Sequence, residues 1–220
     1  MSEFITLSAS DGHKFQAWWA PPQGKPKAGM VVIQEIFGVN NHIRDVTNRF
    51  AKEGYLAIAP ALFDRYKRNF EVGYTEPDIA AGREIMGKVD WDKALLDIEA
   101  ARVSLSSLGS IGVVGFCMGG SLAWLSSTRL PFKAAVCYYG GQVAKYAKEK
   151  CLCPTIMHFG KQDQGIPMTT VDEFKAAQPK IPVFLYDAGH GFACNERGSF
   201  NQVAADEAWK RTLMHFGKFL

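Results

Sequence analysis

A cysteine in the segment VVGFCMGGSLAW, residues 113–124, stands where many enzymes carry a catalytic serine. Gly115 and Gly119 flank Cys117 at two residues on either side. A nucleophile on a tight strand-to-helix turn needs small neighbours at these positions, because larger side chains would clash. A following helix would direct its positive end at the sulfur and favour a thiolate. Cys117 is therefore a candidate nucleophile, and the alternative is a small apolar side chain packed beneath a helix.

A thiol nucleophile needs a general base, and the base needs an acid that orients it. The segment HFGKQDQGIP ends a predicted strand at Gly160 and places Asp163 in the loop that follows. The segment FLYDAGHGF places His190 in the loop after another strand. The order Cys117, Asp163, His190 is the nucleophile–acid–histidine order of the α/β-hydrolase fold. Open α/β sheets carry their sites just past the carboxyl ends of strands, where all three residues are expected.

Asp187 is the chief rival for the role of the acid, because it also follows a strand and lies three residues before His190. Its alternative role is that of a surface or turn carboxylate. The other four histidines are expected beside a hairpin turn, at a helix start, inside a strand and in the last helix, which are poor places for a catalytic base. They are His13, His42, His158 and His215.

The segment VIQEIFGVN ends a strand near Gln34 and carries Glu35 into the next loop. In the α/β-hydrolase arrangement this loop supplies one donor to a developing oxyanion, and the residue after the nucleophile supplies the other. The backbone N–H groups of Ile36 and Met118 are therefore the expected pair. Glu35 itself is expected to be partly buried, and its alternative role is that of a carboxylate at a helix entry.

Apolar strand-like runs alternate with helical patterns along most of the chain. Because these strands are apolar throughout, they predict an α/β fold with a mostly parallel sheet and helices on both faces. The segments 3–8 and 14–19 flank Asp11-Gly12 and predict an antiparallel hairpin at one edge. The other predicted strands are 29–34, 55–60, 111–115, 133–139, 154–160 and 181–187. The predicted helices are 41–53, 90–107, the stretch after Cys117, 168–178 and 200–220.

Segment 61–89 interrupts this alternation, since it carries no strong strand pattern. It contains the basic residues Arg65, Lys67, Arg68 and Arg83. Connections of this length are often functional, and the alternative is a plain connection. No second-domain linker or internal repeat is visible, so residues 1–220 are expected to form a single domain.

The composition is ordinary for a soluble globular protein, with 47% hydrophobic and 21% charged residues in a 220-residue chain. The net charge of +3 is too small to indicate a nucleic-acid or membrane partner. No apolar run approaches the roughly 18 residues of a membrane span, and the N-terminus has no signal pattern, so a cytoplasmic location is expected. Five cysteines, an odd number, argue against a disulfide framework. Neither a metal nor a cofactor is expected.

Together these motifs resemble the dienelactone hydrolase (carboxymethylenebutenolidase) family over nearly the whole chain. They are QEIFG (34–38), GFCMGG (115–120), YYG (138–140), GKQD (160–163) and AGHGF (188–192). The resemblance implies a triad of Cys117, Asp163 and His190 that forms an acyl-enzyme with a small ester or lactone. It also implies that the resting thiol is neutral and turned toward Glu35, which moves on substrate binding and helps to form the thiolate.

The sequence departs from the family pattern where substrate is bound. The family holds a substrate carboxylate with two arginines, one of which follows the catalytic histidine by four residues, where this chain has Cys194. The other falls near Ile79. We expect Arg83 and Arg197 to replace them, or the substrate to be other than a dienelactone. Phe37 and Tyr139, from two of the family motifs, are further expected to contact the substrate.

Three functions remain open at this stage. The first is a thiol-dependent hydrolase of small esters or lactones. The second is a thioesterase or general carboxylesterase that uses the same triad. The third, from a different class, is a non-catalytic or redox-responsive binding module. No feature of the sequence indicates a natural substrate or an oligomeric state.

Overall fold

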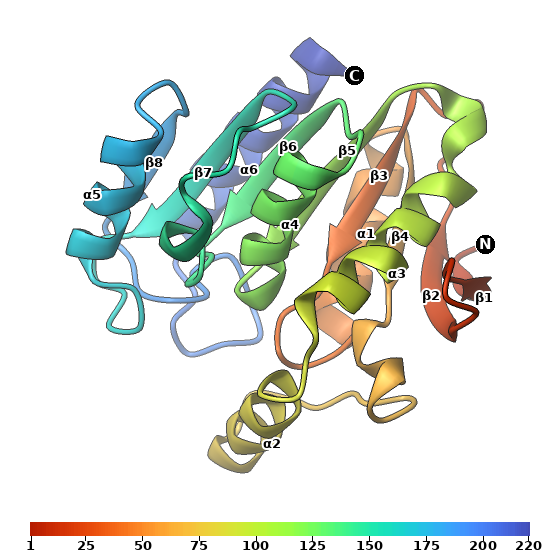
Figure 1. Ribbon diagram of the computed structural model, residues 1–220, viewed down its shortest axis with the longest axis horizontal. Coiled ribbons are helices and arrows are strands. Elements are labelled where there is room, and N and C mark those ends of the chain that lie inside the picture. The colour runs from red at the N-terminus through yellow and green to blue at the C-terminus, as the bar shows by residue number, and fades with distance from the viewer.

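The computed structural model describes residues 1–220, and its centre is an eight-stranded sheet with the strand order β1-β2-β4-β3-β5-β6-β7-β8 (Figure 1). The first two strands pair antiparallel to each other, β2 pairs antiparallel to β4, and all remaining pairs are parallel. The predicted α/β-hydrolase fold with an N-terminal hairpin is confirmed. The strands are β1 (Glu3–Ser8), β2 (Lys14–Ala20), β3 (Ala28–Ile33), β4 (Tyr55–Pro60), β5 (Ile111–Phe116), β6 (Ala134–Tyr138), β7 (Thr155–Gly160) and β8 (Val183–Tyr186).

The central strands β3, β5, β6 and β7 are buried at every residue, as continuous apolar runs predict for a sheet covered on both faces. One hydrophobic core of 58 buried residues extends across the sheet. The helices that enclose it are α1 (Asn41–Lys52), α3 (Trp91–Ser104), α4 (Met118–Arg129), α5 (Met168–Ala177) and α6 (Gln202–Phe219). No helix of the chain combines the length and the apolar character that a membrane crossing requires.

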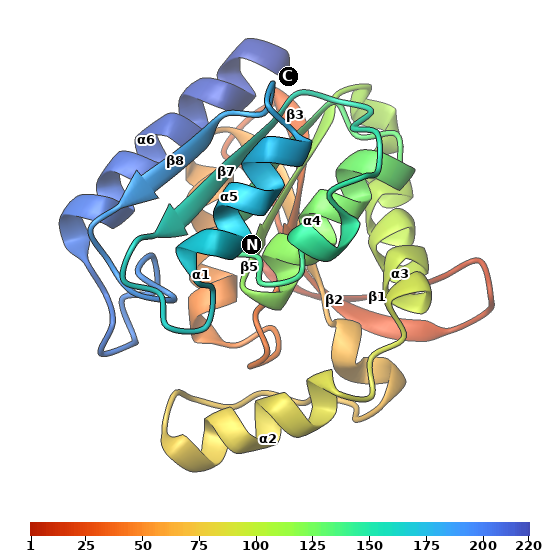
Figure 2. The same cartoon turned by 60° about the vertical axis from the view of Figure 1, so that its left-hand side comes forward.

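The helices lie in two layers, with α1 and α6 on one face of the sheet and α3, α4 and α5 on the other (Figures 1 and 2). Aromatic contacts join the helices within each layer. Phe50 of α1 packs against Trp209 of α6 with ring centroids 4.7 Å apart, and Trp124 of α4 meets Phe174 of α5 at 5.1 Å. These contacts fix the helices over the strands whose carboxyl ends carry the candidate site.

Segment 61–89 is not a plain connection, because it contains the 3-10 turn η1 (Leu62–Arg65) and helix α2 (Glu76–Met86). Thr75 and Asp78 form a reciprocal capping box at the start of α2. Figures 1 and 2 show α2 apart from the two layers, beyond the carboxyl ends of the parallel strands. Gly82 lets α2 approach the loop after β3, because a Cβ at that position would lie 2.5 Å from the carbonyl oxygen of Ile36.

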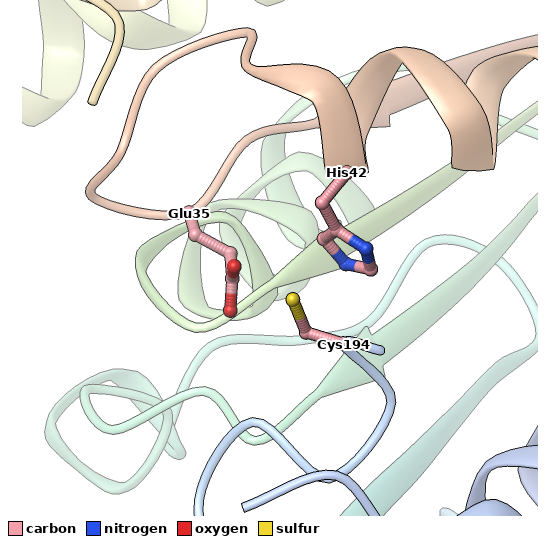
Figure 3. Close-up of side chains that lie close together, drawn as sticks. All are labelled: Glu35, His42 and Cys194. Carbon is pink, nitrogen blue, oxygen red and sulfur yellow. The ribbon is translucent and has the colours of Figure 1, made fainter. Parts of the chain in front are cut away.

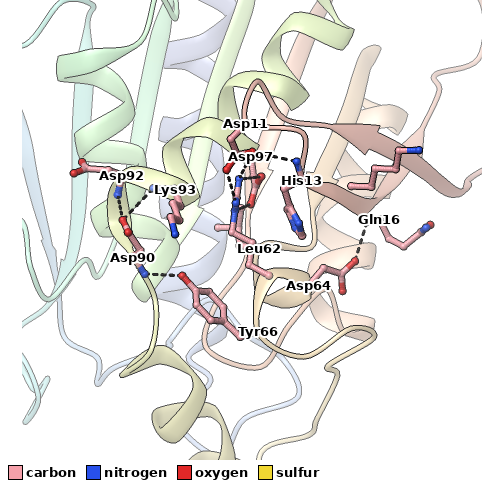
Figure 4. A network of polar contacts seen from close by, with 12 residues as sticks. Asp11, His13, Gln16, Leu62, Asp64, Tyr66, Asp90, Asp92, Lys93 and Asp97 are labelled. Carbon is pink, nitrogen blue, oxygen red and sulfur yellow. Dashed lines mark hydrogen bonds and ion pairs between the residues drawn. The ribbon is translucent and has the colours of Figure 1, made fainter.

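An ion-pair network anchors the beginning of this segment to the body of the protein (Figure 4). Arg65 of η1 donates two hydrogen bonds to Asp97 of α3, at 2.7 and 2.8 Å, and pairs with Asp11 of the β1–β2 turn at 2.7 Å. Asp97 is fully buried. Asp64 accepts from the backbone N–H groups of Gln16 and Asn69. The segment that carries α2 is therefore fixed at its base to both the hairpin and α3.

Candidate active site

Cys117 lies between the end of β5 and the first residue of α4, with a φ of 56°. Non-glycine residues rarely adopt this left-handed conformation, and it is the strained turn expected of a nucleophile. Gly115 and Gly119 allow the turn, since a Cβ on Gly115 would collide with the carbonyl of Gly119, and one on Gly119 with the carbonyl of Ile33. The sulfur is thus held at the amino end of α4, where the helix dipole favours negative charge.

Three predicted residues form one hydrogen-bonded chain at this turn. His190 Nε2 lies 3.2 Å from Cys117 Sγ, and His190 Nδ1 lies 2.7 Å from Asp163 Oδ2. The other carboxylate oxygen, Oδ1, accepts from the backbone N–H groups of Gly165 at 2.8 Å and Ile166 at 3.1 Å. Both oxygens of Asp163 are therefore held, and the carboxylate fixes the orientation of the imidazole.

The surroundings of His190 favour its charged form. Burial alone would lower its pKa, but the hydrogen bonds and charges of Asp163 and Cys117 outweigh burial and raise the pKa to about 10. The Asp163 side chain is completely buried, whereas 26% of the His190 side chain is exposed. His190 is therefore suited to hold a proton next to Cys117, at a distance of 3.2 Å from the sulfur.

Asp187, the rival for the acid, lies outside this chain of contacts. Its carboxylate is exposed and pairs with Lys161 at 3.0 Å. The backbone carbonyl of Asp187 accepts a hydrogen bond from the side chain of Asn201. The structure therefore brings Asp163 to the imidazole and leaves Asp187 as a surface carboxylate.

Glu35 is fully buried in the loop after β3, and its carboxylate is engaged on both oxygens. Arg197 Nη1 lies 3.4 Å from Oε1, and the Tyr74 hydroxyl donates to Oε2 at 3.3 Å. Burial and the charge of Glu35 raise the pKa of Tyr74 far above its usual value, so its hydroxyl stays a donor. The expected contact between a resting thiol and Glu35 is wrong for this structure, because Cys117 is bonded to His190 while Arg197 and Tyr74 hold the carboxylate.

The two expected oxyanion donors are the backbone N–H groups of Ile36 and Met118. The N–H of Met118 belongs to the first residue of α4 and has no partner within the helix. The N–H of Ile36 donates to no other group of the chain. Ile36, Met118 and Cys117 line the same cavity, so both N–H groups are available to an oxygen bound beside the sulfur.

This cavity has a volume of about 570 Å³ and opens between α2 and the turn that carries Cys117. Arg83 and Arg197 both line it. Arg83 is exposed and makes no ion pair, whereas Arg197 is largely buried and lies over the ring of Phe37 at 5.5 Å. Gln142 and His190 add polar groups to the lining, and much of the rest is apolar. The apolar side chains include Phe37, Ile79, Met86, Val89, Trp91 and Ile166.

Tyr139 does not reach the cavity, so its predicted contact with substrate is wrong. Its ring is completely buried behind His190, with centroids 5.1 Å apart, and also meets Phe192. Tyr139 directly follows β6 with a φ of 37°, and this conformation accompanies an inward-facing ring. Tyr139 packs behind the imidazole and does not contact substrate.

Sequence reasoning anticipated Arg83 but did not predict helix α2 that carries it, nor the contact of Tyr74 with Glu35. Ile79, Arg83 and Met86 of α2 form one wall of the cavity. The sequence Thr75-Glu-Pro-Asp78 carries the signal that would have located this helix, namely a capping threonine, an acidic residue three positions later and a proline in the first turn.

Comparison with known proteins gives the family of the chain. The description of the matching family is "Dienelactone hydrolase family", and the match covers residues 15–220. Carboxymethylenebutenolidase of Pseudomonas putida is 33% identical over 227 residues, which cover 97% of this chain and 95% of the relative. A Synechocystis protein named "Putative carboxymethylenebutenolidase" is 38% identical over 207 residues, 85% of this chain and 84% of the relative. The crystal structure of a Klebsiella pneumoniae protein titled "Putative Dienelactone Hydrolase" superposes with a TM-score of 0.86 at 30% identity, covering 99% of this chain and 100% of that one.

Proposed function

The chain belongs to the dienelactone hydrolase family, and from this premise we propose that it hydrolyses small esters or lactones through an acyl-enzyme on Cys117. The observation that carries the proposal is the continuous chain from Asp163 through His190 to Cys117 at the floor of the cavity. Two free backbone N–H groups beside the sulfur complete the set of groups that acyl transfer needs.

In the proposed reaction the thiolate of Cys117 attacks the carbonyl carbon of the substrate. The developing oxyanion accepts hydrogen bonds from the N–H groups of Ile36 and Met118. When the tetrahedral intermediate collapses, the C–O bond breaks and the imidazolium of His190 gives its proton to the departing alcohol. The neutral imidazole then takes a proton from water, which attacks the thioester and releases the carboxylic acid. Asp163 keeps the imidazole in the orientation that both proton transfers need.

We assign Glu35 to the activation of Cys117 on substrate binding, as the family resemblance implies. In the structure its carboxylate is held by Arg197, which also lines the cavity. A substrate that carries a carboxylate would compete for Arg197 and release Glu35. The released carboxylate then helps to form the thiolate, whose proton passes to His190.

The charge of the cavity favours substrates with a carboxylate. Arg83 is the cation there that has no partner, and the walls near it are apolar. We therefore extend the proposal to compact esters or lactones that carry an acidic group, with Arg83 and Arg197 on either side of it. A thioesterase or general carboxylesterase on the same residues is the alternative, and kcat/KM measured over a panel of thioesters, neutral esters and acidic lactones separates the two.

The proposal treats residues 1–220 as a single domain, which the one sheet and its one core support. The expected cytoplasmic location rests on the sequence alone and stays a prediction, as does the expected lack of a cofactor.

The proposed function is tested by hydrolysis of p-nitrophenyl acetate with the wild-type protein, Cys117→Ala and Cys153→Ser. Cys153 lies outside the cavity and serves as the matched cysteine control. We expect Cys117→Ala to lose activity by several orders of magnitude and Cys153→Ser to keep it. Retention of more than about a tenth of the activity by folded Cys117→Ala would show that the nucleophile lies elsewhere.

A further inference from the structure

Beside the proposed active site, Glu35, His42 and Cys194 bring a carboxylate, an imidazole and a thiol together in the protein interior (Figure 3). One ligand atom from each residue lies within 4.8 Å of those of the other two. All three residues are buried, with exposures of 0%, 2% and 0%. We propose that these side chains form a binding site for a borderline-soft divalent metal ion, and that Zn²⁺ is the ion this donor set favours.

His42 is the observation that points to a ligand. Neither of its ring nitrogens has a hydrogen-bond partner, although both are buried. A buried polar atom without a partner costs about 1–3 kcal/mol, so such atoms are rare in native interiors. An imidazole nitrogen without a hydrogen-bond partner has a lone pair to offer a metal ion. Figure 3 shows this ring, the Glu35 carboxylate and the Cys194 sulfur converging on one point.

The spacing of the three ligands is close to what a metal ion requires. Oxygen, nitrogen and sulfur ligands that lie about 2.0–2.3 Å from a tetrahedral ion are roughly 3.4–3.7 Å apart. Donor separations of up to 4.8 Å therefore need to shrink by roughly 1.1–1.4 Å at most. Three separate segments supply the ligands, namely the loop after β3, the first turn of α1 and the loop after β8. This leaves the fourth position to water, as in metal sites with three protein ligands.

Cys194 stands where the dienelactone hydrolase pattern has an arginine, and it brings a thiol to the buried surroundings of Glu35. The Cys194 thiol gives up its proton to solvent as the metal–sulfur bond forms, and the thiolate and carboxylate then balance the two charges of the ion.

A bound ion would also compete with Arg197 and Tyr74 for the Glu35 carboxylate. Ester turnover would fall as Zn²⁺ binds, because Glu35 would no longer be free to activate Cys117. This consequence rests on the proposed function, whereas metal binding itself does not.

The test uses Co²⁺ as a spectroscopic substitute for Zn²⁺ in the full chain that carries Cys117→Ala. This background removes the other cysteine–histidine pair of the site, which could bind metal on its own. We expect one Co²⁺ per chain, an absorption band from thiolate-to-cobalt charge transfer, and loss of that band on addition of Zn²⁺. Adding Cys194→Ser should abolish the band, and adding His42→Gln should weaken Co²⁺ binding at least about tenfold.

The matched control adds Cys151→Ser and Cys153→Ser to the same background, since this pair lies outside the cluster, and the band should remain. Circular dichroism of each variant verifies the fold. The proposal is overturned if folded Cys117→Ala gives no charge-transfer band, or if the band survives Cys194→Ser. Neither result depends on ester hydrolysis, so failure here would leave the proposed function standing.

Discussion

The substitution Asp163→Asn changes one atom of the proposed triad and tests the role of the imidazole tautomer. In the structure Oδ1 of Asp163 accepts from the N–H groups of Gly165 and Ile166, and Oδ2 accepts from His190 Nδ1. The asparagine oxygen must stay on the two backbone donors, because rotating the amide would leave both of them unpaired at a cost of about 1–3 kcal/mol each. Its NH₂ group then faces Nδ1 and forces that nitrogen to accept.

An imidazole that accepts at Nδ1 carries its proton on Nε2, which faces Cys117 Sγ at 3.2 Å. In this tautomer it is unable to take a proton from the thiol. The loss expected from a wrong tautomer is about 10⁴-fold in kcat, or roughly 5.5 kcal/mol of activation free energy. Iodoacetamide should also alkylate Cys117 more slowly at neutral pH, because loss of the Asp163 charge lowers the pKa of His190 and weakens the thiolate–imidazolium pair.

The assay is p-nitrophenyl acetate hydrolysis with Asp163→Asn and with the matched variant Asp187→Asn, each verified by thermal unfolding. Asp187 is exposed and pairs only with Lys161, so its variant should stay within about twofold of wild type. The reasoning is refuted if Asp163→Asn keeps more than about a tenth of the activity, or if Asp187→Asn is the more damaging of the two.

Three further changes have distinct expected outcomes. Glu35→Gln should speed alkylation of Cys117 in the free protein, because it removes a nearby negative charge. The same variant should hydrolyse esters more slowly. If neither rate changes, Glu35 is a structural carboxylate. Arg83→Ala should lower kcat/KM for carboxylate-bearing esters by about three- to fivefold at low salt, less at high salt, and leave neutral esters unchanged. Arg65→Met should lower the urea-measured free energy of unfolding by about 3 kcal/mol, because it leaves Asp97 charged and buried. Burial raises the pKa of Asp97 to about 6 although Arg65 opposes this rise, so the pKa should rise further without Arg65. The decrease in the free energy of unfolding should therefore be largest above pH 6 and become smaller toward pH 5. A decrease that does not depend on pH would contradict this explanation.

Sequence patterns located the sheet and the polar residues at its carboxyl edge, because both follow from local rules. A continuous apolar run predicts a strand buried on both faces, and Cys117 and Asp163 follow two such strands, β5 and β7. His190 follows the partly buried edge strand β8. The predicted strand 181–187 shrinks to β8, Val183–Tyr186, because an edge strand has a pairing partner on one side only. Long-range geometry accounts for what the sequence did not reveal. The pairing of Glu35 with Arg197 joins residues 162 positions apart, and no local pattern reports such a contact.

The sequence also did not predict which side chains lie buried beside the site. His42 was predicted at a helix start, and it is there, but its burial beside Glu35 and Cys194 depends on how α1 meets the loop after β8. Tyr139 was expected at the substrate because it belongs to one of the family motifs. The direction of its side chain depends on a positive φ that only the folded chain reveals.

The proposed acyl-enzyme on Cys117 is tested most directly by rapid acid quenching of the wild-type protein during turnover of p-nitrophenyl acetate, followed by intact-mass and peptide mass spectrometry. We expect a single acetyl group on the peptide that contains Cys117, formed within the first turnover and absent from Cys117→Ala. Turnover without any acetylated protein, or an acetyl group on another side chain such as Ser121, would contradict a thiol nucleophile at this turn.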